Sequence, residues 1–235
     1  MHISNLVSVF GLASLALASP VEVAERQAQK LRIMPLGDSI TEITCWRAFV
    51  WDYLAQAGLA DRVQYVGSQN SNPKGCQPQT WNWDQHHEGH SGWTAVDIAN
   101  NWLAGWLRNT PADIVMFMLG TNDVTRGTGT DQIINAYTKM VQTIRASNPR
   151  AKIIVDTVIP ISWSYGPVEA INARIPQWAA SLNTTDSPIF IADCYNGFST
   201  SWLPDGIHPN LDGDRFLASR IGPLLVNLAR QSLGW

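Results

Sequence analysis

Charged side chains are scarce in this chain. Asp, Glu, Lys and Arg together account for 15% of the 235 residues, and the formal net charge is −3. No run of Lys and Arg occurs along the chain. A protein that binds nucleic acid or an anionic membrane surface through its charge needs such a basic segment. The composition therefore indicates neither nucleic acid nor a membrane as a partner.

Long hydrophobic runs are absent as well. The apolar stretch Leu6–Ala18 has 13 residues, too few to span a bilayer, and no later stretch is long and apolar enough to do so. It ends in an Ala-x-Ala pattern, which is typical of a signal-peptide cleavage site. We predict a secretory signal peptide over residues 1–18; a pro-segment reaching to about residue 30 remains open. Residues 31–235 are then expected to form one secreted, extracellular domain with a full hydrophobic core.

Cysteine is rare, with only three residues in the chain. In an oxidising compartment such residues form disulfides. Cys45 and Cys76 lie in segments typical of loops or element edges, whereas Cys194 follows the apolar run Ile189–Ala192. We predict a Cys45–Cys76 disulfide and a buried thiol at Cys194; a bridge that involves Cys194 remains the alternative. Secretion would also make Asn183, in the only Asn-x-Ser/Thr triplet, a surface glycosylation site.

Tryptophan, by contrast, is abundant, with 11 residues. Part of this surplus is typical of core packing. The rest indicates exposed, flat apolar platforms, which suit sugar rings or acyl chains. We expect Trp81, Trp83, Trp93 and Trp202 to line such a binding site.

Short apolar runs alternate with helical patterns along the chain. Five runs read as strands: Arg32–Leu36, Val63–Gly67, Ile114–Leu119, Lys152–Ile159 and Ile189–Ala192. This alternation predicts an α/β fold, a three-layer sandwich in which helices cover both faces of a parallel sheet. The helical patterns Val168–Leu182 and Asp214–Leu228 contain Pro176 and Pro223, so we expect those helices to be kinked or to start later.

One further helix is expected to start at Thr94. Asp97 is placed to complete a capping box with Thr94. The spacing then directs Ile98, Trp102 and Leu103 toward the core.

Two short segments supply the groups that activate a serine hydroxyl. Ser39 follows the first predicted strand, and Asp205 and His208 share a polar loop near the other end of the chain. A hydroxyl needs a base within hydrogen-bond reach, and the base needs a carboxylate that orients it. We therefore predict Ser39 as nucleophile, His208 as general base and Asp205 as its partner. The simpler interpretation of Ser39 as a helix N-cap does not account for His208.

These residues fall where parallel sheets usually carry their sites. Ser39 follows the first strand, Asn122 follows the third, and the Asp205/His208 loop precedes the last helix. Sites in open parallel sheets gather outside the carboxyl ends of the strands. We expect the three segments to meet at that edge.

Four segments of the chain resemble the sequence blocks of the GDSL/SGNH hydrolases. They are Gly37-Asp38-Ser39-Ile40, Gly89-His90-Ser91-Gly92, Gly120-Thr121-Asn122-Asp123 and Asp205-Gly206-Ile207-His208-Pro209. The resemblance runs from about Arg32 to about Leu228. Residues 37–42 and 89–94 look most like fungal secreted acetylxylan esterases of carbohydrate esterase family 3. The resemblance implies a five-stranded, flavodoxin-like parallel sheet.

The resemblance also implies residue roles and a substrate. The oxyanion hole would consist of the backbone N–H groups of Ser39 and Gly92 and the side-chain amide of Asn122. The activity would be removal of acetyl groups from acetylated xylan through an acyl-enzyme, with no cofactor. We also expect a monomer. Two alternatives stay open. One is the same chemistry on other acetylated polysaccharides such as pectin, or on lipid or short-chain acyl esters. The other is a non-catalytic carbohydrate-binding protein.

One polar cluster could suggest a metal site. Asp84, His86, His87, Glu88 and His90 lie within seven residues of one another. A zincin helix requires His-Glu-x-x-His, and this spacing is not met because Ser91 stands at the last position. We expect a polar loop near the site that holds no metal.

Overall fold

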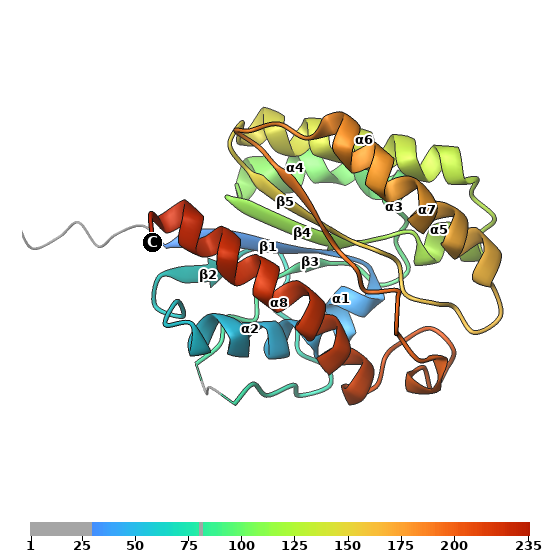
Figure 1. Ribbon diagram of the computed structural model, residues 1–235, viewed down its shortest axis with the longest axis horizontal. Helices are drawn as coiled ribbons and strands as arrows, with labels where there is room; N and C mark the ends of the chain where they lie inside the picture. The colour runs from blue at the N-terminus through green and yellow to red at the C-terminus, as the bar shows by residue number, and fades with distance from the viewer. Residues whose placement is uncertain (1–29, 80–81) are drawn as a thin grey trace, which may run out of the picture.

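A parallel sheet forms the centre of the structure, a computed structural model in which residues 30–79 and 82–235 are described (Figure 1). Its strands are β1 Leu31–Gly37, β2 Val63–Tyr65, β3 Glu88–Gly89, β4 Ile114–Met118, β5 Lys152–Asp156 and β6 Ile189–Ala192. Five of them follow the order β2-β1-β4-β5-β6, and β3 pairs with the end of β1. The predicted signal peptide over residues 1–18, the alternative pro-segment and Trp81 lie outside the described residues.

The apolar strands are covered on both faces, as expected for a parallel sheet. All five residues of β4 are buried. Because side chains alternate along a strand, Val115 and Phe117 pack into one half of the core and Ile114 and Met116 into the other. The predicted three-layer α/β fold is confirmed.

Helices form the two outer layers. The two on one face, seen below the sheet in Figure 1, are α2 Trp46–Gln56 and α8 Leu211–Leu233. Those on the other face are α4 Leu103–Asn109, α6 Thr130–Ser147 and α7 Tyr165–Leu182. The shorter helical segments are α1 Ser39–Ile43, α3 Ala95–Asp97, a π-helical turn at Ile98–Trp102, α5 Thr121–Thr125 and a 3₁₀ turn at Thr200–Trp202. Within the described ranges, no helix is both long and apolar enough to cross a membrane.

Strand β5 ends three residues before its predicted end at Ile159. The backbone of Val158 pairs with a side chain instead of a strand: its N–H donates to Asn172 Oδ1 and its carbonyl accepts from Asn172 Nδ2, both at 2.8 Å. Asn172 lies on α7 and thus replaces the next strand as a hydrogen-bond partner. The apolar run continues in sequence, but the sheet does not.

The expected inward orientation of Trp102 is wrong, whereas the predicted cap at Thr94 is present. The Thr94 side chain accepts a hydrogen bond from the N–H of Asp97. The next turn is π-helical over Ile98–Trp102, so residues five apart lie on one face. Ile98 and Leu103 are both fully buried, and Trp102 is 47% exposed. The wider turn thus rotates Trp102 out of the core.

Both proline-containing helices begin before the predicted patterns rather than after them. Helix α7 starts at Tyr165 and α8 at Leu211, and each runs continuously through its internal proline, Pro176 or Pro223. The start of α8 is fixed by Asn210, whose side chain accepts hydrogen bonds from two N–H groups of the first turn. A strong cap thus outweighs the missing N–H of a proline farther along.

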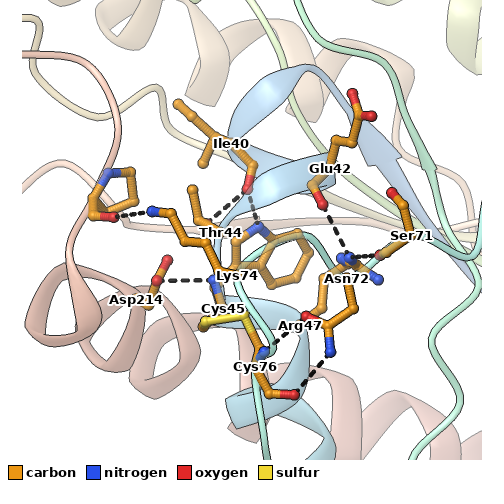
Figure 2. Close-up of a disulfide and its surroundings, with 12 residues drawn as sticks. Ile40, Glu42, Thr44, Cys45, Arg47, Ser71, Asn72, Lys74, Cys76 and Asp214 are labelled. Atoms are coloured by element: carbon orange, nitrogen blue, oxygen red, sulfur yellow. Dashed lines mark hydrogen bonds between the residues drawn. A yellow bond between two sulfur atoms is a disulfide. The ribbon is translucent and has the colours of Figure 1, made fainter. Parts of the chain in front are cut away.

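A disulfide joins the start of α2 to the following long loop. It links Cys45 and Cys76, with 5.3 Å between their Cα atoms, and Cys194 is a buried free thiol. Figure 2 shows the buried Arg47 side chain directed at the backbone carbonyl oxygens of Glu42 and Ser71, at 3.2 and 3.0 Å. The cross-link and Arg47 therefore hold the same loop against the helices that follow β1.

A buried carboxyl group stands at the end of β5. Asp156 is 1% exposed, and neither of its carboxyl oxygens has a hydrogen-bond partner among the described residues. Burial raises the pKa of Asp156 well above its ordinary value. The folded protein therefore keeps this proton at pH values at which the unfolded chain has released it. The stability that results is fully present below about pH 4 and is lost as the pH rises through the folded-state pKa.

We predict that Asp156→Asn raises the melting temperature at pH 8 and that its advantage over the wild type shrinks toward pH 4. The amide has the shape of the carboxyl group but never carries its charge. The expected gain at pH 8 is a few degrees, since about 1 kcal/mol shifts the midpoint of a domain of this size by about 2–4 °C. Thermal unfolding followed by circular dichroism measures it, with the exposed Asp186→Asn as control. A gain that is equal at both pH values would contradict the explanation.

Candidate active site

The structure brings Ser39, His208 and Asp205 into one hydrogen-bonded chain. The imidazole Nε2 of His208 lies 2.7 Å from Ser39 Oγ, although the two residues are 169 positions apart. Its Nδ1 lies 2.7 Å from Asp205 Oδ2. The predicted nucleophile, base and orienting carboxylate thus stand in the order and at the distances that general-base activation of a hydroxyl requires.

Ser39 is positioned by the sharp turn between β1 and α1. The preceding residue, Asp38, caps α1, because its Oδ1 accepts a hydrogen bond of 3.0 Å from the N–H of Ile40. The interpretation of Ser39 as the N-cap is therefore wrong. With Asp38 as the cap, the Ser39 hydroxyl is available to His208.

The other two members share a tight loop just before α8. Asp205 Oδ1 accepts hydrogen bonds from the backbone N–H groups of Ile207 and His208, at 3.0 and 2.7 Å. Burial alone would raise the pKa of Asp205, but the hydrogen bonds from the backbone and ring of His208 and from Ile207 lower it to about 2. The carboxylate therefore stays ionised in the pH range of enzyme catalysis, although 57% of its side chain is exposed. It holds Nδ1 protonated and leaves Nε2 to accept the serine proton.

The loop that carries Gly92 (residues 90–94, the Gly92 loop) lies beside the turn that carries Ser39. Strand β3 pairs Gly89 with Gly37, and the N–H of His90 donates to the carbonyl of Gly37 at 3.0 Å. The loop after β3 is thus joined to the residue two positions before Ser39. This short parallel pairing, which the sequence analysis did not predict, sets the distance between the two loops.

Two charged side chains hold the Gly92 loop in place. Glu42 Oε2 accepts a 2.7 Å hydrogen bond from the N–H of Ser91, and Arg126 Nη2 donates to the carbonyl oxygen of Gly92 at 2.5 Å. The N–H of Gly92 donates to no described group, and neither does that of Ser39. Gly92 also has a φ of 80°, a backbone conformation that suits glycine. Both N–H groups are thus available to a ligand oxygen.

Asn122 contacts both the turn that carries Ser39 and the Gly92 loop. Its amide nitrogen donates to Asp38 Oδ2 at 3.2 Å and to the carbonyl oxygen of Trp93 at 2.9 Å. An amide nitrogen has two hydrogens, so donation to an oxyanion requires the exchange of one contact, and the longer one to Asp38 is the weaker. Burial raises the pKa of Asp38 to about 7. The role of Asn122 as an oxyanion donor stays a prediction.

Asp123, which follows Asn122, has a structural part. Its buried carboxylate accepts hydrogen bonds from the N–H groups of Ala95 and Val96, at 2.7 and 3.3 Å. It therefore holds the first turn of α3, which follows the Gly92 loop.

The tryptophans expected at the site are found in different surroundings. Trp83 is buried in the core and packs beneath the Arg47 guanidinium, so its predicted role in lining the site is wrong. Trp93 is partly buried, directly follows Gly92 and stacks on His90 at 4.7 Å. Trp202 packs edge-on against Phe198 near the Asp205 loop. Of the three predicted tryptophans that the structure describes, we therefore keep Trp93 and Trp202 as candidates for substrate contact.

The histidine-rich segment is occupied by partners within the protein. Glu88 is buried and accepts hydrogen bonds from Ser68 and from His90 Nε2, the latter at 2.7 Å. The His87 ring accepts from the N–H of Gly89 at 3.0 Å, and burial lowers the pKa of His87 to about 3. Across the described ranges, no three His, Cys, Asp or Glu residues are arranged to hold a metal ion.

Asn183, the predicted glycosylation site, lies at the surface. It follows α7 and is exposed, and its side-chain oxygen accepts a 2.8 Å hydrogen bond from the N–H of Ile189. The side-chain nitrogen, to which a glycan would be attached, is not part of that bond.

For two side chains at the site, the sequence predicted no role. Glu42 and Arg126 hold the Gly92 loop from separate elements, α1 and the residue after α5. A charged residue one turn beyond a motif is also typical of an ordinary solvated helix face. Only the fold shows that each meets the backbone of a segment far away in sequence.

Comparison with known proteins gives a consistent result. The sequence profile of the GDSL-like lipase/acylhydrolase family matches residues 36–216. Two crystal structures are 51% identical to the chain and cover 86% of it and 99% of their own chains, each with a TM-score of 0.83. One is a serine-to-alanine mutant of an acetyl esterase with an acetate ion. The other is a carbohydrate esterase family 3 protein from Talaromyces cellulolyticus.

A multidomain esterase from Ruminococcus flavefaciens is also similar. It is 25% identical over 230 residues, which cover 86% of this chain. The chain spans only 29% of the length of that protein.

We predict that Ser39→Ala lowers kcat by several orders of magnitude and leaves the melting temperature unchanged. The hydroxyl contacts His208 and contributes chemistry rather than packing. Steady-state hydrolysis of an aryl acetate and a thermal melt measure both quantities. Ser91→Ala is the matched control and should keep full activity. Near-normal turnover of the Ser39 variant, or labelling of Ser91 by a serine-directed organophosphorus reagent, would overturn the assignment.

Asn122→Ala is expected to lower kcat about 10²–10³-fold with a smaller change in KM, because an oxyanion donor acts in the transition state. Asn122→Asp keeps the shape, loses the donor and should be impaired at least as strongly. Kinetics with a short-chain acetate ester give both parameters. A change confined to KM would mean that Asn122 binds substrate instead.

Proposed function

We propose that this chain, an esterase of the GDSL-like lipase/acylhydrolase family and of carbohydrate esterase family 3, removes acetyl groups from a plant cell-wall polysaccharide, acetylated xylan. The observation that carries the proposal is the hydrogen-bonded chain from Ser39 through His208 to Asp205. It lies at the carboxyl edge of the sheet, where parallel α/β proteins bind their ligands.

The reaction starts with attack of Ser39 Oγ on the acetyl carbonyl carbon while His208 Nε2 takes the serine proton. The carbonyl oxygen becomes negative and is stabilised by the N–H groups of Ser39 and Gly92 and by the amide of Asn122. The bond to the sugar oxygen then breaks, and His208 gives its proton to that oxygen. Water, deprotonated by His208, next attacks the acetyl carbon of the acetyl-enzyme. The bond to Ser39 Oγ then breaks, acetate is released, and His208 returns the proton to Ser39 Oγ. Asp205 stabilises the imidazolium in both steps.

Two features support a polymeric substrate. The Asp205 side chain is more than half exposed, so the triad lies at an open surface that a chain of sugars can reach. Two proteins at 51% identity are described as an acetyl esterase and a family 3 carbohydrate esterase. Secretion with removal of residues 1–18, a single mature domain over residues 31–235 and a monomeric state belong to the same proposal.

An acyl-length series combined with acetate release tests the proposal. We expect acetate esters to be hydrolysed at least about tenfold faster than butyrate esters. Butyrate has two more methylene groups than acetate, and a site shaped for acetyl discriminates against each additional methylene by about 1 kcal/mol. Acetate should be released from acetylated xylan at a rate that is lost in Ser39→Ala. Faster hydrolysis of long-chain esters would favour a lipid substrate. Acetate release from acetylated pectin but not from xylan would favour the other polysaccharide.

A further inference from the structure

Trp163 is the most exposed large hydrophobic side chain of the described residues. Its side chain lies in the segment between β5 and α7, and 63% of it is exposed. Removing an indole face from water is favourable by about 25 cal/mol per Å². The exposed part of this indole is therefore suited to bind a ligand with an apolar face.

This indole lies against the loop of the triad. A Cβ atom at Gly206 would overlap the Trp163 ring, so the ring rests on the backbone between Asp205 and His208. The N–H of Ser162 donates to the carbonyl oxygen of Gly206 at 3.0 Å and fixes the two loops together. Only glycine fits at position 206, both for this close approach and for its φ of 84°. The Cζ3 and Cε3 atoms of the indole thus lie against this loop, and most of the residue remains exposed to solvent.

The chemistry decides which part of a substrate would reach Trp163. His208 Nε2 gives its proton to the oxygen of the leaving alcohol, so the alcohol must lie on the His208 side of the ester. The predicted oxyanion donors, Ser39, Gly92 and Asn122, surround the carbonyl oxygen instead. Gly206 is two residues from His208, at most about 7 Å between Cα atoms. Trp163 therefore lies beside the loop that carries the predicted alcohol-side base.

We propose that Trp163 is a stacking platform for a sugar ring of the deacetylated chain, next to the residue that carries the acetyl group. The inference rests on the proposed function and specifies its alcohol subsite. A pyranose ring presents a flat row of C–H groups to an aromatic face, while its hydroxyl groups stay in water. Trp163 thereby contributes to the recognition of a polysaccharide without taking part in bond breaking.

The experiment compares two substrates that share the acetyl group and differ in the alcohol. Acetylated xylotriose offers sugar rings, and ethyl acetate offers no ring that could stack. Trp163→Ala should lower kcat/KM for acetylated xylotriose about 3- to 10-fold, mainly through KM, and change kcat/KM for ethyl acetate less than about twofold. Trp163→Phe retains a smaller ring and should lie between the alanine variant and the wild type.

The matched control is Trp235→Ala. Trp235 is 58% exposed and lies over Arg62, whose carbonyl oxygen pairs with the start of β1 at the opposite edge of the sheet. This variant should keep wild-type kinetics on both substrates.

The outcomes separate the subsite from the function on which it rests. No loss on either substrate would overturn the subsite. Equal losses on both would show that Trp163 only braces the Asp205 loop, and would also overturn it. If the wild type hydrolyses ethyl acetate but releases no acetate from acetylated xylotriose, the proposed substrate is wrong and the subsite falls with it.

Discussion

The hydrogen bond between Ser39 Oγ and His208 Nε2 is the contact on which the proposed chemistry of this protein depends. It spans 169 positions at a distance of 2.7 Å, so neither segment could set it alone. The sheet places both segments at one edge, and the helices then fix the distance between them. The N–H of Cys45, just after α1, donates to Asp214 Oδ2 in the first turn of α8 at 2.8 Å. Lys74 in the disulfide loop also donates a hydrogen bond to the carbonyl oxygen of Pro209, next to His208.

Buried polar groups, more than regular elements, hold the loops around this bond. Arg47 donates to four backbone carbonyls in three segments, Glu88 fixes His90, and Asp123 holds the start of α3. Each leaves unsatisfied groups behind if it is removed, which costs about 1–3 kcal/mol per buried group. The Gly92 loop is held mainly through its carbonyl groups and its Ser91 N–H. This arrangement leaves the Gly92 N–H without a partner among the described residues, as the predicted oxyanion hole requires.

The sequence was sufficient to predict five of the six strands and to nominate Ser39, Asp205 and His208, because the strand patterns and the Asp-x-x-His spacing are local. The apolar run of β6 predicted its observed bounds, and the Asp-x-x-His spacing placed Asp205 and His208 on one loop. Strand β3 was missed because a strand of two residues is too short to show an alternation of apolar and polar side chains. Trp83 and Trp163 could not be told apart by sequence, since burial is decided by tertiary packing. The π-helical turn that exposes Trp102 likewise has no signature in the hydrophobic pattern.

Detection of the acetyl-enzyme is the most direct test of the proposal that Ser39 is the nucleophile and His208 its base. An activated aryl acetate makes acylation faster than deacylation, so the covalent intermediate accumulates early in the reaction. Samples quenched in acid within the first turnover would be digested and mapped by mass spectrometry. We predict one acetyl group per protein molecule, on Ser39, and none in a His208→Ala variant over the same time. An acetyl group on another residue, or turnover with no acetylated peptide, would contradict it.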